Sequence, residues 1–186
     1  IPDIEKTTYQ KKNYPETLKK YLKYPTRNWM QDTFLKEMQK MNLLIENERN
    51  FVYGVSTGGR GAALLALENP AIFKAAACLS ADFDHSNLGD EPINNGFYGS
   101  QKLFPDRRTG KDNIYNRAAE FTNSLFLAHG LNDKVCPVSQ TRDFSEQLDE
   151  LNSNITVETN LDTKGDHTYT WWDKKTLPIL QFFAQF

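Results

Sequence analysis

The chain has 186 residues, which fits one domain with a sizeable buried core. Its 22 basic and 24 acidic residues give a net charge of −2, so no basic surface is indicated and nucleic acid is excluded as an expected partner. No apolar run reaches the roughly 20 residues that span a bilayer, so we expect no membrane-spanning segment.

The chain divides by composition into two parts. Residues 1–28 are rich in Lys, Tyr, Pro and Thr and contain no strand-like run, so we expect an N-terminal polar segment whose structure the pattern does not define. Residues 29–186 are expected to form the C-terminal part of a single domain. Within it, residues 82–117 are rich in Asn, Asp, Gly and Pro, which indicates a loop-rich excursion above the sheet.

Short apolar runs predict four buried strands in the second part. They lie at 51–55, 75–80, 124–129 and 155–159, and helical patterns occur at 29–41, 57–68, 139–151 and 175–186. Parallel strands need crossover connections, so strands that alternate with helices predict a mainly parallel sheet covered by helices. The expected fold class is α/β, a three-layer sandwich.

The segment Phe51-Val-Tyr-Gly-Val-Ser-Thr-Gly-Gly-Arg-Gly-Ala is the most informative part of the sequence. It predicts a strand, a sharp turn at Ser56 and a helix, which is the context that a G-x-S-x-G nucleophile elbow requires. A phosphate-binding loop is the competing interpretation, and it fails because no Lys-Ser or Lys-Thr pair closes the loop. We therefore predict that Ser56 is a nucleophile projected clear of the sheet.

The glycines around Ser56 are expected to make this turn possible. A side chain at Gly54 or Gly58 is expected to collide across the turn, and Gly59 and Gly61 are expected to let the helix pack closely against the sheet. The helix N-terminus points free N–H groups towards the serine, which favours developing negative charge there.

A serine nucleophile needs a base, and the sequence offers three histidines. His167 follows the last predicted strand, and the order serine, acid, histidine is the one that hydrolases with this elbow use. His85 lies in the excursion, and His129 ends the third strand, where its side chain is expected to pack in the strand-to-loop turn. We predict His167 as the base, with the other two histidines as alternatives.

The acid that orients the base is expected between the serine and the histidine, beyond a strand end. Asp133 lies four residues past the third predicted strand and is our choice. Asp166 adjoins His167 and is expected to be a solvated turn residue. Asp82 and Asp84 follow the second strand and are expected to line the pocket.

Several stretches of the chain occur in the order found in a known family. They are W-M-Q-D-T-F-L-K-E-M before the elbow, G-V-S-T-G-G-R-G-A at it, and E-N-P-A-I-F-K-A-A-A-C-L-S-A-D-F-D, H-G-L-N-D-K-V-C-P, G-D-H-T-Y-T-W-W and L-P-I-L-Q-F-F after it. On these stretches residues 29–186 resemble the esterase D family of α/β-hydrolases, which includes S-formylglutathione hydrolase, feruloyl and other carbohydrate esterases, and mycolyltransferases. The resemblance implies the triad Ser56, Asp133 and His167, with the backbone N–H of Thr57 as one oxyanion donor.

The chain departs from that family before the elbow. Family members have several strands there, and a loop from that half supplies the second oxyanion N–H. Nothing in residues 1–50 resembles those strands, so we expect the second donor outside this chain and an exposed apolar sheet edge at 51–55. An upstream segment, a partner chain or a second subunit is expected to complete the sheet.

These features predict a serine esterase that forms an acyl-enzyme with a small-molecule carboxylic, thio- or carbohydrate ester, without a cofactor or metal. We expect the pocket walls to come from residues 82–117 and from Tyr169, Trp171 and Trp172, although packing of the final helix explains these aromatics equally well. Two alternatives stay open: an acyltransferase or peptidase with the same triad, and a hydrolase-like domain or fragment that binds without catalysis.

Overall fold

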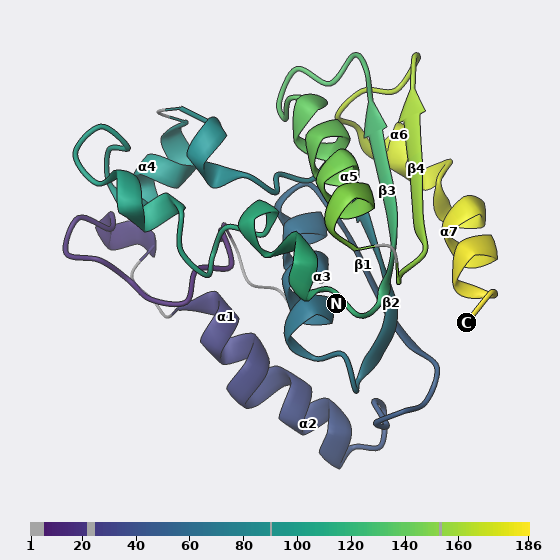
Figure 1. Ribbon diagram of the computed structural model, residues 1–186. Helices are drawn as coiled ribbons and strands as arrows, with labels where there is room; N and C mark the ends of the chain where they lie inside the picture. Colours follow the sequence, from purple (N-terminus) through teal and green to yellow (C-terminus); the bar gives the residue numbers. More distant parts are fainter. Residues whose placement is uncertain (1–5, 22–24, 90, 153) are drawn as a thin grey trace.

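The computed structural model describes residues 6–21, 25–89, 91–152 and 154–186. Residues 1–5 and 22–24 of the expected N-terminal segment, residue 90 of the excursion and residue 153 lie outside the described residues. The described residues form a four-stranded parallel sheet in the order β1-β2-β3-β4 (Figure 1). The strands are β1 (Asn50–Val55), β2 (Phe73–Leu79), β3 (Ser124–Gly130) and β4 (Val157–Asp162).

Helices cover both faces of this sheet, which confirms the predicted α/β three-layer sandwich (Figure 1). On one face lie α3 (Thr57–Glu68) and α5 (Ser139–Leu151); on the other lie α6 (Tyr169–Asp173) and α7 (Thr176–Phe183). Successive side chains of a strand point to opposite faces. Accordingly Cys78 of β2 packs in the core under α3, whereas its neighbours Ala77 and Leu79 pack in the core under α7.

A helical rod leads into the first strand. It consists of α1 (Thr26–Trp29), a π-helical stretch (Met30–Phe34) and α2 (Leu35–Lys40), and it begins three residues before the predicted start at residue 29. Met30 and Leu35 are buried in the same core as α3, so the rod packs along that helix (Figure 1). Its hydrophobic spacing is what made it visible in the sequence.

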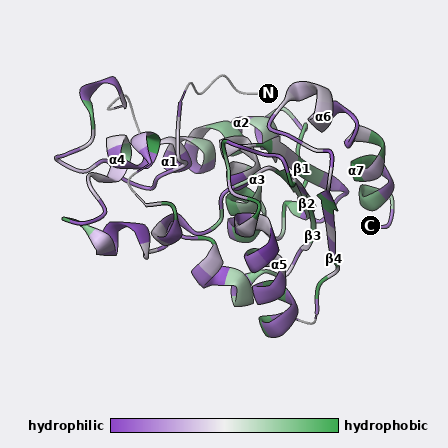
Figure 2. Cartoon of the chain, turned by 90° about the horizontal axis from the view of Figure 1, so that it is seen from above, coloured by the Kyte–Doolittle hydropathy of each residue, from purple (hydrophilic) through white to green (hydrophobic). Residues whose placement is uncertain are grey.

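The described N-terminal residues pack on the excursion. Thr17 donates its hydroxyl to the Phe97 carbonyl oxygen at 2.7 Å, and the buried Arg27 guanidinium lies 2.6 Å from Asp112. The N-terminal residues include a short 3₁₀ turn at Lys19–Tyr21. The excursion contains α4 (Pro92–Tyr98) and 3₁₀ turns at His85–Asn87 and Pro105–Arg108, and a third 3₁₀ turn, Tyr115–Glu120, begins at its end. Seen from above, these parts gather to one side of the sheet and are mostly hydrophilic (Figure 2).

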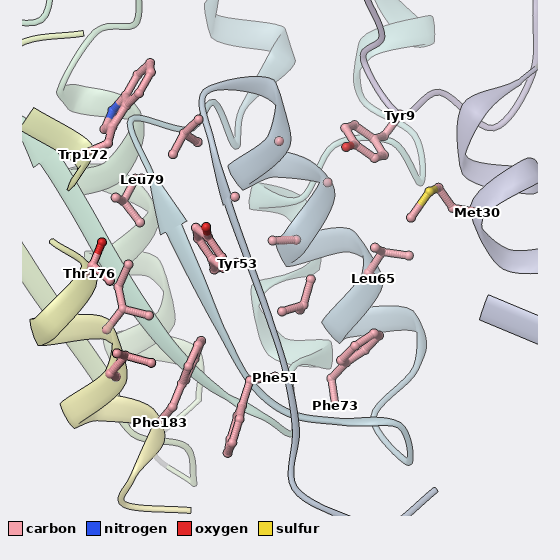
Figure 3. Close-up of a pocket in the computed structure, with 18 of the residues that line it drawn as sticks. Tyr9, Met30, Phe51, Tyr53, Leu65, Phe73, Leu79, Trp172, Thr176 and Phe183 are labelled. Carbon is pink, nitrogen blue, oxygen red and sulfur yellow. The ribbon is translucent and has the colours of Figure 1, made fainter. Parts of the chain in front are cut away.

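Strand β1 forms one edge of the described sheet, as expected for residues 51–55. A hollow of about 1140 Å³ runs along this edge (Figure 3). Its walls come from the helical rod and α3 on one side and from α6 and α7 on the other. Tyr53 of β1 is 60% exposed and lies in the middle of it, so an apolar surface follows the unpaired edge.

Several strand and helix bounds differ from the prediction; β2, for example, begins at Phe73 rather than at residue 75. β4 begins at Val157 rather than at residue 155, and all of its residues are half-buried or exposed, because it forms the other edge of the described sheet. The helix predicted over 175–186 is α7, Thr176–Phe183, and a separate short helix, α6, precedes it. α6 begins where the Thr168 hydroxyl accepts the Trp171 N–H.

Candidate active site

Ser56 joins β1 to α3 in a backbone conformation that L-residues rarely adopt. Its φ is 54° and its ψ is −128°. The turn is fixed on both sides, because the Ser56 N–H donates to the Leu79 carbonyl oxygen at 2.8 Å and the Ser56 carbonyl oxygen accepts the Gly59 N–H at 2.9 Å. Strain of this kind persists only where the surroundings over-determine it, and here it sets the hydroxyl at the carboxyl end of the sheet.

The glycines of the turn have three different tasks. A Cβ on Gly54 would lie 2.2 Å from the Gly58 carbonyl oxygen, and one on Gly59 would lie 2.9 Å from the Ala81 Cβ, so both permit a close approach, as expected. The collision expected for a side chain at Gly58 is wrong, because nothing lies within 4 Å of a Cβ there and the position faces the open hollow. The role expected for Gly61, close packing of the helix on the sheet, is also wrong: this glycine makes room for the Tyr9 ring.

The structure brings Ser56, His167 and Asp133 together from the ends of three strands. His167 Nε2 lies 3.0 Å from Ser56 Oγ, and His167 Nδ1 lies 2.7 Å from Asp133 Oδ2. These are the two contacts through which a base takes a serine proton and a carboxylate holds the resulting imidazolium. The Ser56–His167–Asp133 relay therefore has the geometry of a nucleophile, a base and an acid.

Asp133 is held as a buried carboxylate. Its side chain is fully buried, and its Oδ1 accepts the backbone N–H groups of Val135 at 2.8 Å and Cys136 at 2.9 Å. Burial raises the pKa of Asp133, but the Cys136 N–H, the His167 ring and the Val135 N–H together outweigh it and hold the pKa below its usual range. The carboxylate is thus ionised at neutral pH.

The loops that carry the acid and the base are fastened to each other. A Cβ on Gly130 would lie 2.2 Å from the Gly165 carbonyl carbon, so only glycine at the end of β3 lets the two loops approach this closely. The Asn132 N–H also donates to the Gly165 carbonyl oxygen at 2.9 Å. Asp133 and His167 are therefore positioned relative to each other by contacts between their own loops.

The predicted aromatic residues after His167 separate into different environments. Trp172 packs edge-on against the His167 ring, with 4.9 Å between the ring centroids, and donates its indole N–H to Ser80 Oγ at 3.1 Å. Tyr169 is 80% exposed and lines the hollow together with Trp172. Trp171 is buried, donates its indole N–H to Asp162 Oδ2 at 2.9 Å and packs on Gly165, which is the packing role that the sequence left open for it.

The alternative bases lie in other environments. His85 is fully buried, and its Nε2 lies 2.6 Å from Asp82, which also pairs with Arg60. His129 is fully buried behind Asp133, with its Nε2 3.3 Å from Asp133 Oδ2.

The remaining candidate acids also have other partners. Asp84 caps the short 3₁₀ turn at His85–Asn87, and the exposed Asp166 accepts the Thr168 hydroxyl. Neither these residues nor any other described part of the excursion 82–117 lines the hollow along β1, and their place in the wall of a substrate pocket stays a prediction.

The Thr57 N–H is the predicted oxyanion donor. Thr57 is the first residue of α3, so its N–H has no acceptor in a preceding helical turn, and it adjoins the nucleophile. The hollow of Figure 3 reaches this point through residues that include Val55, Gly58 and Trp172, and no member of the triad lines it. The hollow therefore follows the sheet edge and ends next to the site.

Sequence reasoning missed Tyr9. This residue has a positive φ of 53°, packs on Gly61 of α3 and lines the hollow near the elbow (Figure 3). Burial raises the pKa of its phenol to about 12. The sequence around Tyr9 is polar and without periodicity, so it did not indicate a buried residue. The signal in the sequence was Gly61, a helical glycine that leaves space for a large side chain from elsewhere.

The described residues contain neither a cluster suited to a metal ion nor a helix that could span a membrane. No group of three or more His, Cys, Asp or Glu side chains there is placed to hold a metal ion. Helices in the described ranges are all too short or too polar to cross a bilayer.

A strained serine on a strand-to-helix turn, set beside a histidine and a buried carboxylate on a parallel sheet, defines a class: the protein has the α/β-hydrolase fold with a serine–histidine–aspartate site. Within that class, residues 14–185 match the sequence profile of the prolyl oligopeptidase family, and the chain belongs to this family. The superfamily implied by the sequence resemblance is thus confirmed, whereas the matched family is not the esterase D family.

Solved structures share the fold at low sequence identity. An acylaminoacyl peptidase of Pyrococcus horikoshii has a TM-score of 0.67 and 21% identity, over 81% of this chain and 26% of that one. Dipeptidyl peptidase 4 of Porphyromonas gingivalis has a TM-score of 0.64 and 17% identity, over 73% of this chain and 19% of that one. A fluorophosphonate-binding serine hydrolase of Staphylococcus aureus has a TM-score of 0.64 and 22% identity, over 86% of this chain and 64% of that one.

The chain spans about a quarter of the length of the Pyrococcus peptidase, about a fifth of the Porphyromonas peptidase and just under two thirds of the staphylococcal hydrolase. No curated protein sequence matches it significantly.

Proposed function

We propose that the chain carries the active site of a serine peptidase. Ser56 Oγ attacks a peptide carbonyl carbon while His167 accepts the hydroxyl proton, and Asp133 stabilises the imidazolium. The C–N bond then breaks as His167 returns the proton to the leaving amine. A water molecule, deprotonated by His167, releases the acyl group from Ser56. The observation that carries the proposal is the geometry at the strained elbow: Ser56 Oγ lies 3.0 Å from His167 Nε2, and His167 Nδ1 lies 2.7 Å from Asp133 Oδ2.

The choice of an amide substrate rests on the family and on the chemistry of the leaving group. The chain belongs to the prolyl oligopeptidase family, and an acylaminoacyl peptidase and a dipeptidyl peptidase share its fold. An amine leaves only when it is protonated, so peptide cleavage depends on a base that returns its proton. His167 is placed to do this, because Asp133 orients its ring and Trp172 packs against it.

The proposal includes a second oxyanion donor from a segment beside β1. The Thr57 N–H supplies one hydrogen bond, and the unpaired edge of β1 with its apolar hollow fits a further strand. An upstream segment, a partner chain or a second subunit fills this place in the proposal. A missing oxyanion donor costs about a hundredfold to a thousandfold in rate, so this segment matters to activity.

Ester hydrolysis is the second candidate function. The same triad cleaves esters, and the fluorophosphonate-binding hydrolase that shares the fold is closer to this chain in length than the peptidases are. An alkoxide or phenolate leaves without the full help of a proton donor, so an ester makes a smaller demand on His167. Acyl transfer uses the same acyl-enzyme and differs only in the acceptor.

A matched pair of substrates distinguishes these functions. We would assay a peptide p-nitroanilide and the p-nitrophenyl ester of the same acyl group, with Ser56→Ala as the control. Turnover of both substrates, abolished in Ser56→Ala, is the expected result. Turnover of the ester alone would favour the esterase, and a rate that Ser56→Ala leaves unchanged would overturn both functions.

A further inference from the structure

His129 lies behind the proposed acid and outside the reaction described so far. Its side chain is completely buried at the end of β3. Nε2 of its ring lies 3.0 Å from the Cys136 carbonyl oxygen and 3.3 Å from Asp133 Oδ2, while Nδ1 lies 2.7 Å from the Thr141 hydroxyl of α5. The same Asp133 oxygen faces His167 Nδ1 on its other side.

The partners of the ring define its protonation. Both oxygens that face Nε2 are acceptors, so Nε2 carries a proton, whereas the Thr141 hydroxyl is able to donate to Nδ1. Burial lowers the pKa of His129. The ring is therefore neutral at pH 7 and presents one N–H between the Cys136 carbonyl and Asp133 Oδ2.

From this geometry we propose that His129 is a positioning residue, which donates its Nε2–H to Asp133 and thereby keeps that carboxylate aimed at His167. Asp133 is fully buried, so each lone pair without a donor disfavours its ionised form. Oδ1 has two backbone donors. Oδ2 lies 2.7 Å from His167 Nδ1 and 3.3 Å from His129 Nε2, whose N–H also faces the Cys136 carbonyl oxygen at 3.0 Å. In the proposal this shared N–H is the fourth donor to the carboxylate.

The inference rests on the proposed function, because His129 acquires this task only if Asp133 serves His167. The titratable groups that face the arrangement are His167, Asp133 and the Cys136 thiol, with Asp82 acting on Cys136 from the far side. Loss of the His129 donor should shift the pH dependence of the rate in one direction. A less stabilised carboxylate takes up a proton at higher pH, and an ionised one exerts a stronger field on His167, so the acidic limb of a pH–rate profile moves to higher pH in both cases.

Two short amides make a matched pair at position 129. In His129→Gln the side-chain amide nitrogen takes the place of Nε2 and keeps a donor towards Asp133. In His129→Asn the shorter amide reaches the place of Nδ1 and keeps only the contact with Thr141. Thr141→Val is the third variant, because it removes a buried hydrogen bond of the same ring and leaves the side facing Asp133 unchanged.

The rate at which a fluorophosphonate labels Ser56, followed by intact-mass spectrometry between pH 5 and 9, tests the inference. His129→Asn should label about tenfold more slowly at neutral pH, with its acidic limb at higher pH, whereas His129→Gln should stay within about threefold of the wild type. Thr141→Val should lower the unfolding temperature and keep the limb in place, which separates positioning from general destabilisation.

Two outcomes would overturn this role and leave the proposed function intact. One is a His129→Asn protein with the wild-type rate and an unmoved acidic limb. The other is a His129→Gln protein that is as slow as His129→Asn. If His129→Asn fails to fold, the comparison of His129→Gln with Thr141→Val still tests the inference. The His129→Gln protein must then keep the acidic limb of its pH–rate profile at the wild-type pH. A wild type without label at Ser56 would overturn the proposed function and this inference with it.

Discussion

At the scale of single residues, the site depends on side chains that fix the base as much as on the triad. The Trp172 indole packs on His167, and its N–H is bound by Ser80, a buried residue with a positive φ of 48° at the end of β2. A ring that is anchored in this way restricts the imidazole to one orientation. Catalytic geometry is sensitive to such support, since small displacements of a base lower the rate strongly.

Trp172→Phe tests this support, because it removes the indole N–H and keeps an aromatic ring next to His167. We expect turnover to fall by about threefold to tenfold, which corresponds to one buried hydrogen bond. Ser80→Ala removes the same bond from the other side and should have a similar effect. The measurement is a double-mutant cycle on kcat: the double variant should be no slower than the slower single variant, and additive losses would contradict the account.

The elbow glycines allow a second prediction at this scale. Gly54→Ala should destabilise the protein by more than about 2 kcal/mol, because the new Cβ would lie 2.2 Å from the backbone of Gly58. Gly58→Ala is the matched control: its Cβ meets nothing within 4 Å, and alanine favours the helix by up to about 1 kcal/mol. Urea unfolding of both variants checks this, and equal stabilities would disprove the proposed crowding.

At the scale of elements, the excursion is joined to the domain by a buried cluster of charges. Arg60 of α3 pairs with Asp82 and donates to the carbonyl oxygens of Thr8 and Asp112. Burial and the Arg60 charge lower the pKa of His85 to about 4, although Asp82 opposes them, and the pKa of Asp82 is lowered to about 2 by His85 and Arg60 against its own burial. The cluster thus holds one cation, one anion and a neutral imidazole.

This cluster makes stability depend on pH in a defined window. In the unfolded chain His85 takes up a proton near pH 6.5, and in the folded protein only near pH 4, so the unfolded state binds more protons between these values. The free energy of unfolding should therefore fall as the pH drops through this range, by roughly 1 kcal/mol per pH unit for this group. Asp82 contributes in the same direction only below about pH 4, where the unfolded carboxyl becomes protonated.

Urea unfolding at pH 7 and pH 5 measures this effect. His129 is also buried with a lowered pKa and adds to the slope, so the informative quantity is the difference between the wild type and His85→Gln. The glutamine keeps an amide donor towards Asp82 and does not titrate, so the variant should lose less stability between the two pH values. Equal losses would show that His85 does not hold its neutral form on folding.

Elements with local periodicity were predictable, and those built from distant polar pairs were not. The spans of α3 and α5 agree with the prediction at both ends, because their apolar spacing and flanking residues are local signals. The triad followed from chain order and strand ends, and the structure brings its members together. In contrast, Thr17 and Arg27 are buried by partners about 80 residues away, and such pairing leaves no mark on the nearby sequence.

At the scale of the whole molecule, the unpaired edge of β1 is an exposed apolar feature of the described residues. Tyr53 is 60% exposed on this strand, and the hollow beside it has apolar walls on both faces of the sheet. Flat apolar edges of this kind pair with other chains. The edge also adjoins the elbow, so whatever covers it will influence the oxyanion site.

The exposed edge predicts self-association of the chain on its own. Tyr53→Lys places a charge on the edge and should shift the association observed by light scattering to concentrations about tenfold higher. Leu103→Lys is the control, because Leu103 is 71% exposed in the excursion and does not line the hollow. Equal behaviour of the two variants would show that β1 is not the surface responsible.

The central claim is that Ser56 is a nucleophile activated by His167 and Asp133. The most direct test is the mass of the intact protein after reaction with a fluorophosphonate, compared among the wild type, Ser56→Ala and His167→Ala. The wild type should gain one phosphonyl group, located on Ser56 by peptide mapping, while Ser56→Ala should gain none and His167→Ala should react at least a thousandfold more slowly. A folded wild-type chain that gains no label, or a label that persists in Ser56→Ala, would contradict the account.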